Sequence, residues 1–311
     1  NKIMAMLVAF GLVGSVSAVE VNENLSINGF IDSSWSSTDD STRTNDDVNL
    51  GVDEIELNFL FSAGGVSGEV HVDTEGDDLG QSVDIEQAHL SYGFEGGISL
   101  TLGRFNTALG LEQEDPGGVY GTARLYQNDP VNLADIDSNG AQEGLRIGFS
   151  AEQFSGSLTA FNAVGTEEEN NAGEDDLDFE LAIAFTGLEN ITLGGGVQSR
   201  NGATAGAVPD VDVSTINASY TAGKLLIGAE WVSVDIEGEG DSSAWGVVAD
   251  YDVSDVLGIS VRYSDEDDTV FGDGVGVITE GDRLSIAPSY AITDSLGAIL
   301  EYSASNIGDD D

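Results

Sequence analysis

The sequence contains no cysteine, and histidine occurs only twice in its 311 residues. The absence of cysteine excludes both a disulfide framework and a metal site with thiolate ligands. Positive charge is also scarce, because nine Lys and Arg residues face 57 Asp and Glu residues, which leaves a formal net charge of −48. Such a chain repels nucleic acid, so nucleic-acid binding is excluded, and it favours cations near its surface.

Long hydrophobic runs are absent as well, so no transmembrane helix is expected. The longest apolar run, residues 3–14, follows Lys2 and precedes the small residues of VSA at 16–18. A basic flank, a short apolar run and a small-residue cleavage site are typical of a secretory signal peptide. We therefore expect residues 1–18 to be an export signal and residues 19–311 to form one domain, with a buried N-terminal helix as the alternative.

Apolar and polar residues alternate from residue 24 onward, as in LGISVRYS at 257–264, and this period of two predicts β-strands. Fifteen strands are expected, near residues 24–36, 48–62, 66–73, 84–95, 98–105, 143–151, 154–164, 177–187, 191–200, 211–221, 224–236, 242–252, 256–265, 281–291 and 296–304. The connections alternate between tight turns and long acidic loops, which is typical of an up-and-down barrel inserted from one side of a membrane. Because an odd number of antiparallel strands cannot close, a sixteenth strand is expected after residue 311. The predicted fold is all-β, a transmembrane antiparallel up-and-down β-barrel of about 16 strands.

Aromatic residues near both strand ends, such as Tyr92, Tyr220, Trp231 and Tyr302, predict interfacial girdles and an apolar face turned to lipid. The opposite, polar face would then line a water-filled lumen, where a row of acids is tolerated. The residues predicted to form this pore wall are Glu54, Glu56, Glu69, His71, His89, Arg146, Asp178, Glu180, Glu230, Arg262, Arg283 and Glu301.

Arg104 does not fit this pattern, because it has the same parity as Leu100 and Leu102 and would face lipid. Either a β-bulge shifts the register there, or the side chain lies at the rim and extends its guanidinium group to the interface.

Residues 106–142 are the longest stretch without alternation, and such a long connection in a compact fold is commonly functional. It is the third long loop, and it is predicted to be a constriction loop. Its candidate site residues are Glu112, Glu114, Asp115, Tyr120, Arg124, Tyr126, Asp129, Asp135 and Asp137.

Three blocks carry a family resemblance: LTLGRFNTALGLEQEDPGGVYGTARLYQNDP at 100–130, INGFIDSSW at 27–35 and EQAHLSYGF at 86–94. They resemble Gram-negative outer-membrane porins of the OmpL-like β-barrel type. The resemblance implies that the third loop folds into the barrel and that its acids face basic wall residues across the opening. Arg146, Arg262 and Arg283 are the candidates for that wall, and so few bases argue against carrying over an anion selectivity.

The expected function is a passive diffusion channel for small hydrophilic solutes and ions, with a preference for cations. An alternative is a substrate-specific channel for a sugar or a divalent cation, in which Tyr120 and Tyr126 would line the path of the substrate. A secreted β protein outside the membrane is another. An outer-membrane enzyme is not expected, because no nucleophile motif accompanies His71 and His89.

No cofactor and no metal site are expected, apart from loosely bound Ca²⁺ at acidic loops such as DEDD at 265–268. The expected partners are outer-membrane lipid, lipopolysaccharide and small hydrophilic solutes, in the bacterial outer membrane. A homotrimer is an option that the residues do not test.

Overall fold

The computed structural model describes residues 2–11, 18–40, 47–75, 83–112, 141–163, 177–201, 210–238, 240–267, 269–271, 276–278 and 281–307. Every regular element in these ranges is a β-strand. The described part of the chain has no helix long and apolar enough to cross a bilayer.

The described strands fall into a 17-stranded sheet and a separate two-stranded sheet. The large sheet comprises β1 (Lys2–Gly11), β2 (Val19–Asn22), β3 (Leu25–Asp40), β4 (Asp47–Ala63), β5 (Val66–Glu75), β6 (Asp84–Gly93), β7 (Ile98–Asn106), β8 (Ala141–Ser150), β9 (Phe154–Ala163), β10 (Asp178–Leu188), β11 (Ile191–Arg200), β12 (Val211–Ala222), β13 (Leu225–Ile236), β14 (Gly240–Asp252), β15 (Leu257–Glu266), β18 (Gly281–Thr293) and β19 (Leu296–Ile307). The small sheet is a hairpin of β16 (Thr269–Phe271) and β17 (Gly276–Ile278), within a connection that alternation had predicted as a loop. All fifteen expected strands are present, as β3 to β15, β18 and β19.

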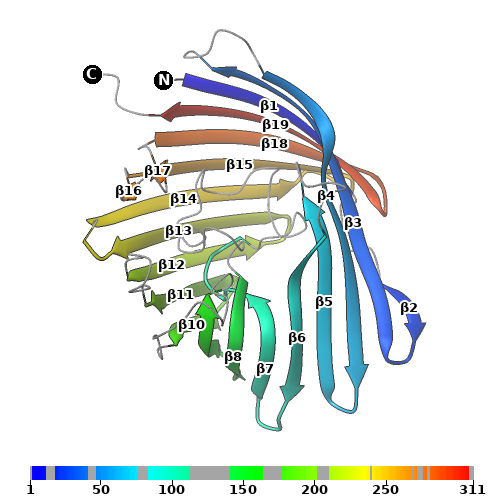
Figure 1. Ribbon diagram of the computed structural model, residues 1–311. Coiled ribbons are helices and arrows are strands. Elements are labelled where there is room, and N and C mark those ends of the chain that lie inside the picture. Colours follow the sequence, from blue (N-terminus) through cyan, green and yellow to red (C-terminus); the bar gives the residue numbers. More distant parts are fainter. Residues whose placement is uncertain are drawn as a thin grey trace.

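From β3 onward, each strand of the large sheet pairs antiparallel with the next strand of that sheet along the chain. β1 pairs with both β19 and β3, and Figure 1 shows it between them, as the strands curve around a common interior. Among the described strands, all of this sheet except the four-residue β2 therefore form a ring of sixteen. The fold is an up-and-down antiparallel β-barrel, as predicted.

The sixteenth strand comes from an unexpected place. Alternation placed it after residue 311, whereas the structure builds it from Lys2–Gly11, within the predicted export signal. The physical reason is that strands β19 and β3 both present unpaired backbone groups, and an apolar extended segment satisfies them. Removal of residues 1–18 stays a prediction, because this pairing belongs to the uncleaved chain.

The two ends of the barrel differ, as expected from the connections. At one end the strands are joined by tight turns, such as Gly64–Gly65 between β4 and β5, where both residues have positive φ. Glycine adopts this backbone conformation without a steric penalty, so the turn can be two residues long. The strand ends that flank the long connections are all at the opposite end, and the longest connection follows β7.

Burial alternates along the strands, with polar side chains facing the interior and apolar side chains facing outward. Along β15, Arg262 and Ser260 are 3% and 2% exposed, whereas Val261 between them is 40% exposed. The same contrast holds on β12, where Ile216 is 62% exposed and its neighbour Thr215 is 6% exposed. A continuous outer surface of large apolar side chains marks contact with lipid rather than with water.

Aromatic side chains pair on this outer surface near both ends of the barrel. Tyr92 packs edge-on against Phe94 at a tight-turn end, with ring centroids 4.7 Å apart. Trp245 and Tyr263 lie 5.4 Å apart farther along β14 and β15. These positions fit the girdles at the two membrane interfaces.

Candidate functional site

The chain turns into the barrel directly after β7. Residues 107–112 leave the strand end and cross the interior, making contacts with β10, β13 and β15, which lie farther round the ring. We call this stretch the loop base, because it begins the long connection 106–142.

Glu180 on β10 holds the first turn of the loop base. Its carboxylate accepts hydrogen bonds from the Thr107 hydroxyl at 2.5 Å and from the Ala108 backbone N–H at 3.0 Å. Arg146 Nη2 lies 3.3 Å from the same carboxylate, and the side-chain amides of Gln142 and Gln198 donate to it at 2.6 and 3.1 Å. Glu180 is 1% exposed, so these five donors replace the water that a buried carboxylate would otherwise need.

Arg146 on β8 ties the strand end to this carboxylate. Its guanidinium group donates to the backbone carbonyl of Asn106 at 2.8 Å and lies 4.3 Å from the ring centroid of Phe105. The bond to Asn106 fixes the direction in which the chain leaves β7. Arg146 therefore fixes the point at which the loop base begins, and Glu180 binds the residues that follow.

The loop base continues to two further wall residues. The Leu111 N–H donates to Glu230 Oε2 on β13 at 3.1 Å, and Arg262 Nη2 on β15 lies 3.4 Å from Glu112 Oε2. The side chains of Arg262 and Glu112 are only 4% and 8% exposed. One loop acid thus contacts one wall base directly, and the opposition of loop acids and wall bases across an opening stays a prediction.

Two glycines make room for the apolar side chains of the loop base. A Cβ on Gly196 of β11 would come 2.4 Å from Leu109 Cδ2, and a Cβ on Gly228 of β13 would come 2.7 Å from Leu111 Cδ2. Any larger residue on the wall would therefore push the loop base toward the centre of the barrel.

The wall beside these leucines is apolar, which corrects the expectation of a polar lumen all round. Leu109 packs in a buried cluster of inward-facing residues from β10 and β12 to β14, with Leu111 and Val211 against its edge. The other members are Ala182, Val213, Val232, Val234, Ile236 and Ala244. Hydrophobic burial therefore adds to the hydrogen bonds that hold the loop base in place.

A cavity of about 620 Å³ lies on the tight-turn side of the loop base. It is bounded by Ala108 and Leu109 above and by β7 to β12 around it, and its walls are rich in glycine and serine, including Gly148, Gly194 and Ser157. Small inward residues leave space that larger side chains would fill in a barrel of this kind.

The structure places all twelve predicted wall residues on the inner face, half-buried or buried. Seven are buried: Glu56, His71, Asp178, Glu180, Glu230, Arg262 and Glu301. Five are intermediate: Glu54, Glu69, His89, Arg146 and Arg283. Glu180, Glu230 and Arg262 contact the loop base directly, and Arg146 binds Asn106 where the loop base begins.

Of the predicted loop residues, Glu112 is described. Glu114, Asp115, Tyr120, Arg124, Tyr126, Asp129, Asp135 and Asp137 lie outside the described residues. Their part in a constriction stays a prediction.

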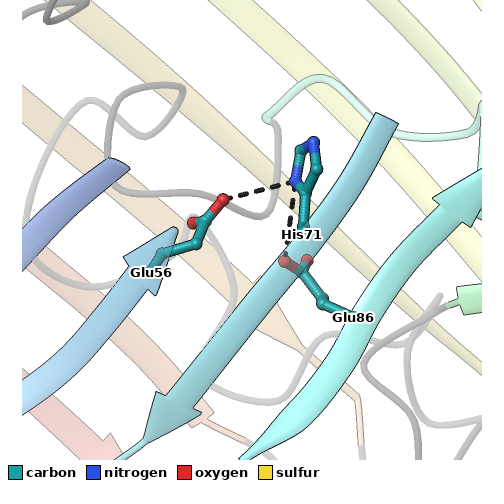
Figure 2. Close-up of side chains that lie close together, drawn as sticks. All are labelled: Glu56, His71 and Glu86. Atoms are coloured by element: carbon teal, nitrogen blue, oxygen red, sulfur yellow. Dashed lines mark ion pairs between the residues drawn. The ribbon is translucent and has the colours of Figure 1, made fainter. Parts of the chain in front are cut away.

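A second inward cluster lies on β4, β5 and β6, where Glu56, His71 and Glu86 come together (Figure 2). Sequence reasoning missed Glu86, because strict alternation from Gln87 turns it toward lipid. The pairing of β5 with β6 shifts register between His71 and Val72, which pair with Gln87 and Ile85. Glu86 is the extra residue of this β-bulge, and the bulge turns it inward, where it is 7% exposed. The sequence did contain a signal for the bulge, because alternation placed an acid on the lipid-facing side, where a charged side chain costs free energy.

For Arg104 the sequence left two explanations, a β-bulge that shifts the register or a position at the rim of the barrel. Its pairing with Ala88 on β6 and Glu143 on β8 continues without a register shift, so the bulge reading is wrong at this position. The side chain keeps the outward parity of Leu102, two residues before β7 ends at Asn106. It therefore lies at the rim on the long-loop side, directly across from an exposed glutamate.

The sequence model of the Gram-negative porin family matches residues 4–306. The chain belongs to this family. No curated protein matches the chain in sequence. The family membership identifies an outer-membrane channel of Gram-negative bacteria and points away from an enzyme.

Solved structures agree with the fold. The outer-membrane channel DcaP of Acinetobacter baumannii has a TM-score of 0.57 at 12% identity, covering 98% of this chain and 96% of that one. An anion-selective porin from Comamonas acidovorans has a TM-score of 0.55 at 11% identity, covering 98% of both chains. In-vitro folded OmpT of Vibrio cholerae, in its trimer form, has a TM-score of 0.53 at 13% identity, also covering 98% of both. At these identities the likeness concerns the fold alone.

Proposed function

We propose that this porin is a passive diffusion channel for small hydrophilic solutes and ions, and that it prefers cations. The proposal is carried by the seating of the loop base inside the barrel, bound to Glu180, Glu230 and Arg262 on three different strands. A segment held across a sixteen-strand barrel narrows its aqueous passage, so solute size limits permeation.

Liposome swelling tests the passive channel. Proteoliposomes should swell in isotonic sugar solutions at rates that fall smoothly as the sugar becomes larger. Rates that saturate for one sugar and not for others of the same size would contradict passive diffusion and favour the substrate-specific channel.

The proposed cation preference rests on charge. Carboxylates outnumber bases along the inner wall, and the formal net charge of −48 enriches cations at the mouth. The fold does not determine the sign, since one similar structure is an anion-selective porin. The reversal potential across a planar bilayer in a salt gradient measures the preference directly, and a potential of the anion-selective sign would refute it.

The proposed assembly is a homotrimer in contact with lipid and lipopolysaccharide. One similar structure is described as a trimer form, and the outer apolar face supports lipid contact. Light scattering of the detergent-solubilised protein should give three times the mass of one chain, and a monomer mass would refute the trimer.

Export with removal of residues 1–18 is also proposed. N-terminal sequencing of protein isolated from outer membranes should then begin at Val19. If the sequence began at or before Lys2, β1 would be part of the working barrel and the proposed cleavage would be wrong.

A further inference from the structure

We propose that Glu56, His71 and Glu86 form a binding site for one divalent transition-metal ion, of which Zn²⁺ is the representative, on the inner wall of the barrel. The three residues come from adjacent strands, and their donor atoms all lie within 4.8 Å of one another. Figure 2 shows one ring nitrogen of His71, Nδ1, facing both carboxylates, with a dashed line to each.

The spacing of the donor atoms fits a small metal ion. His71 Nδ1 lies 3.3 Å from Glu56 Oε1 and 3.9 Å from Glu86 Oε2. Two ligands of tetrahedral zinc, each about 2.1 Å from the metal, are ~3.4 Å apart. One edge of the tetrahedron is therefore already in place, and a small rotation of Glu86 brings in the second.

Glu56 is the observation that points to a ligand. Its side chain is fully buried, and no described residue donates a hydrogen bond to either of its carboxylate oxygens. A buried carboxylate without donors costs free energy, and a cation at Oε1 would remove that cost. Its carboxylate is directed at Nδ1 of His71.

The second ring nitrogen of His71 is oriented in the way that metal-binding histidines need. Nε2 lies 3.2 Å from Glu69 Oε2, so the tautomer that carries its proton on Nε2 can donate to that carboxylate and keep its lone pair on Nδ1. Carboxylates in this position fix the tautomer and the ring orientation of histidine ligands. Gln87 Nε2 lies 3.3 Å from Nδ1, which is consistent with an unprotonated Nδ1 that accepts.

The β-bulge in β6 is the fourth observation. Without the extra residue Glu86 would face lipid, and the bulge instead turns it toward His71. Bulges commonly re-aim a side chain at a functional site. The donor set of one imidazole and two carboxylates selects zinc-like ions over Ca²⁺ and Mg²⁺, which take oxygen ligands.

The test is a Zn²⁺ titration of the full chain, measured by calorimetry in excess Ca²⁺. The protein is folded in detergent and first freed of metal by a chelator. The excess Ca²⁺ occupies weak sites on acidic loops. Wild type is expected to bind one Zn²⁺ per chain, and Glu56→Gln and His71→Gln to bind it at least ~10-fold more weakly. His89→Gln, which removes the other inward histidine, is the matched control and should bind like wild type.

A bilayer measurement gives an independent readout. Zn²⁺ on the inner wall adds positive charge there, so it should reduce the cation preference of wild type and leave that of His71→Gln unchanged.

Equal Zn²⁺ affinity in wild type, Glu56→Gln and His71→Gln would overturn the site, as would absence of binding in all three. An alternative occupant of the cluster, a proton on His71, predicts that absence. Conductance without metal is unaffected by either result, so the channel function is judged separately. Heat-modifiable gel mobility verifies that each variant is folded.

Discussion

Arg262 Nη2 lies 3.4 Å from Glu112 Oε2, although the two residues are 150 positions apart in the chain. The contact joins the loop base to the opposite wall, and both side chains are more than nine-tenths buried. It answers why one of nine basic residues occurs in the middle of an apolar strand: the guanidinium group faces the interior, and the apolar neighbours face lipid.

Neutralising Glu112 and neutralising Arg262 should change the ion selectivity in opposite directions. Glu112→Gln removes a negative charge beside the passage and should lower the cation preference, whereas Arg262→Gln should raise it. The reversal potential in a salt gradient measures both. Because the partners are in contact, the effects of the double variant should not be additive. Additive shifts would mean that the pair does not act together.

Glu180 should be the principal anchor of the loop base. Glu180→Gln keeps the shape of the side chain but loses the charge-assisted bonds to Thr107, Ala108 and Arg146, which should destabilise the seated loop by about 1–3 kcal/mol. Single-channel recordings are expected to show larger or more variable conductance. Asp178→Asn on the same strand is the control, because Asp178 bonds to Asn201 rather than to the loop base. Equal conductance changes in both variants would refute a specific anchor.

The fit of Leu111 against Gly228 should be sensitive to one methyl group. A Cβ at this position would come 2.7 Å from Leu111 Cδ2, so Gly228→Ala should displace the end of that flexible side chain and shift the loop base inward. Conductance should fall while the fold is retained. Gly51→Ala is the matched control, since a Cβ there meets no atom within 4 Å. Unchanged conductance in Gly228→Ala would show that the loop base does not limit the passage.

The inside-out distribution of side chains can be tested at two neighbouring positions of β12. Ile216→Lys puts a charge on the lipid-facing surface and should cost about 2–4 kcal/mol near the bilayer midplane. Asn217→Lys puts the same charge into the cavity below the loop base and should fold normally while altering selectivity. Folding yield into lipid vesicles, read from gel mobility, distinguishes the two. The reverse order would contradict the orientation of the strand.

The sequence by itself determined the strands and their faces. Alternation is a local property, because side chains on a strand point to opposite sides whatever the strand pairs with. All fifteen strands from β3 to β19 in the large sheet could therefore be read from the chain, as could the inward side of all twelve residues of the predicted wall. The family resemblance added the prediction that the third loop folds inward, of which the structure describes only the loop base, residues 107–112.

Only the tertiary structure decided which of those inward residues meet. The five donors around Glu180 come from β8, β11 and the loop base, and their convergence depends on barrel curvature and strand register, which no local pattern encodes. The bulge that turns Glu86 inward is likewise a property of a pair of strands, since an extra residue is defined only against its partner. The same holds for β1, whose place between β19 and β3 follows from the open edges on both sides and not from its own apolar sequence.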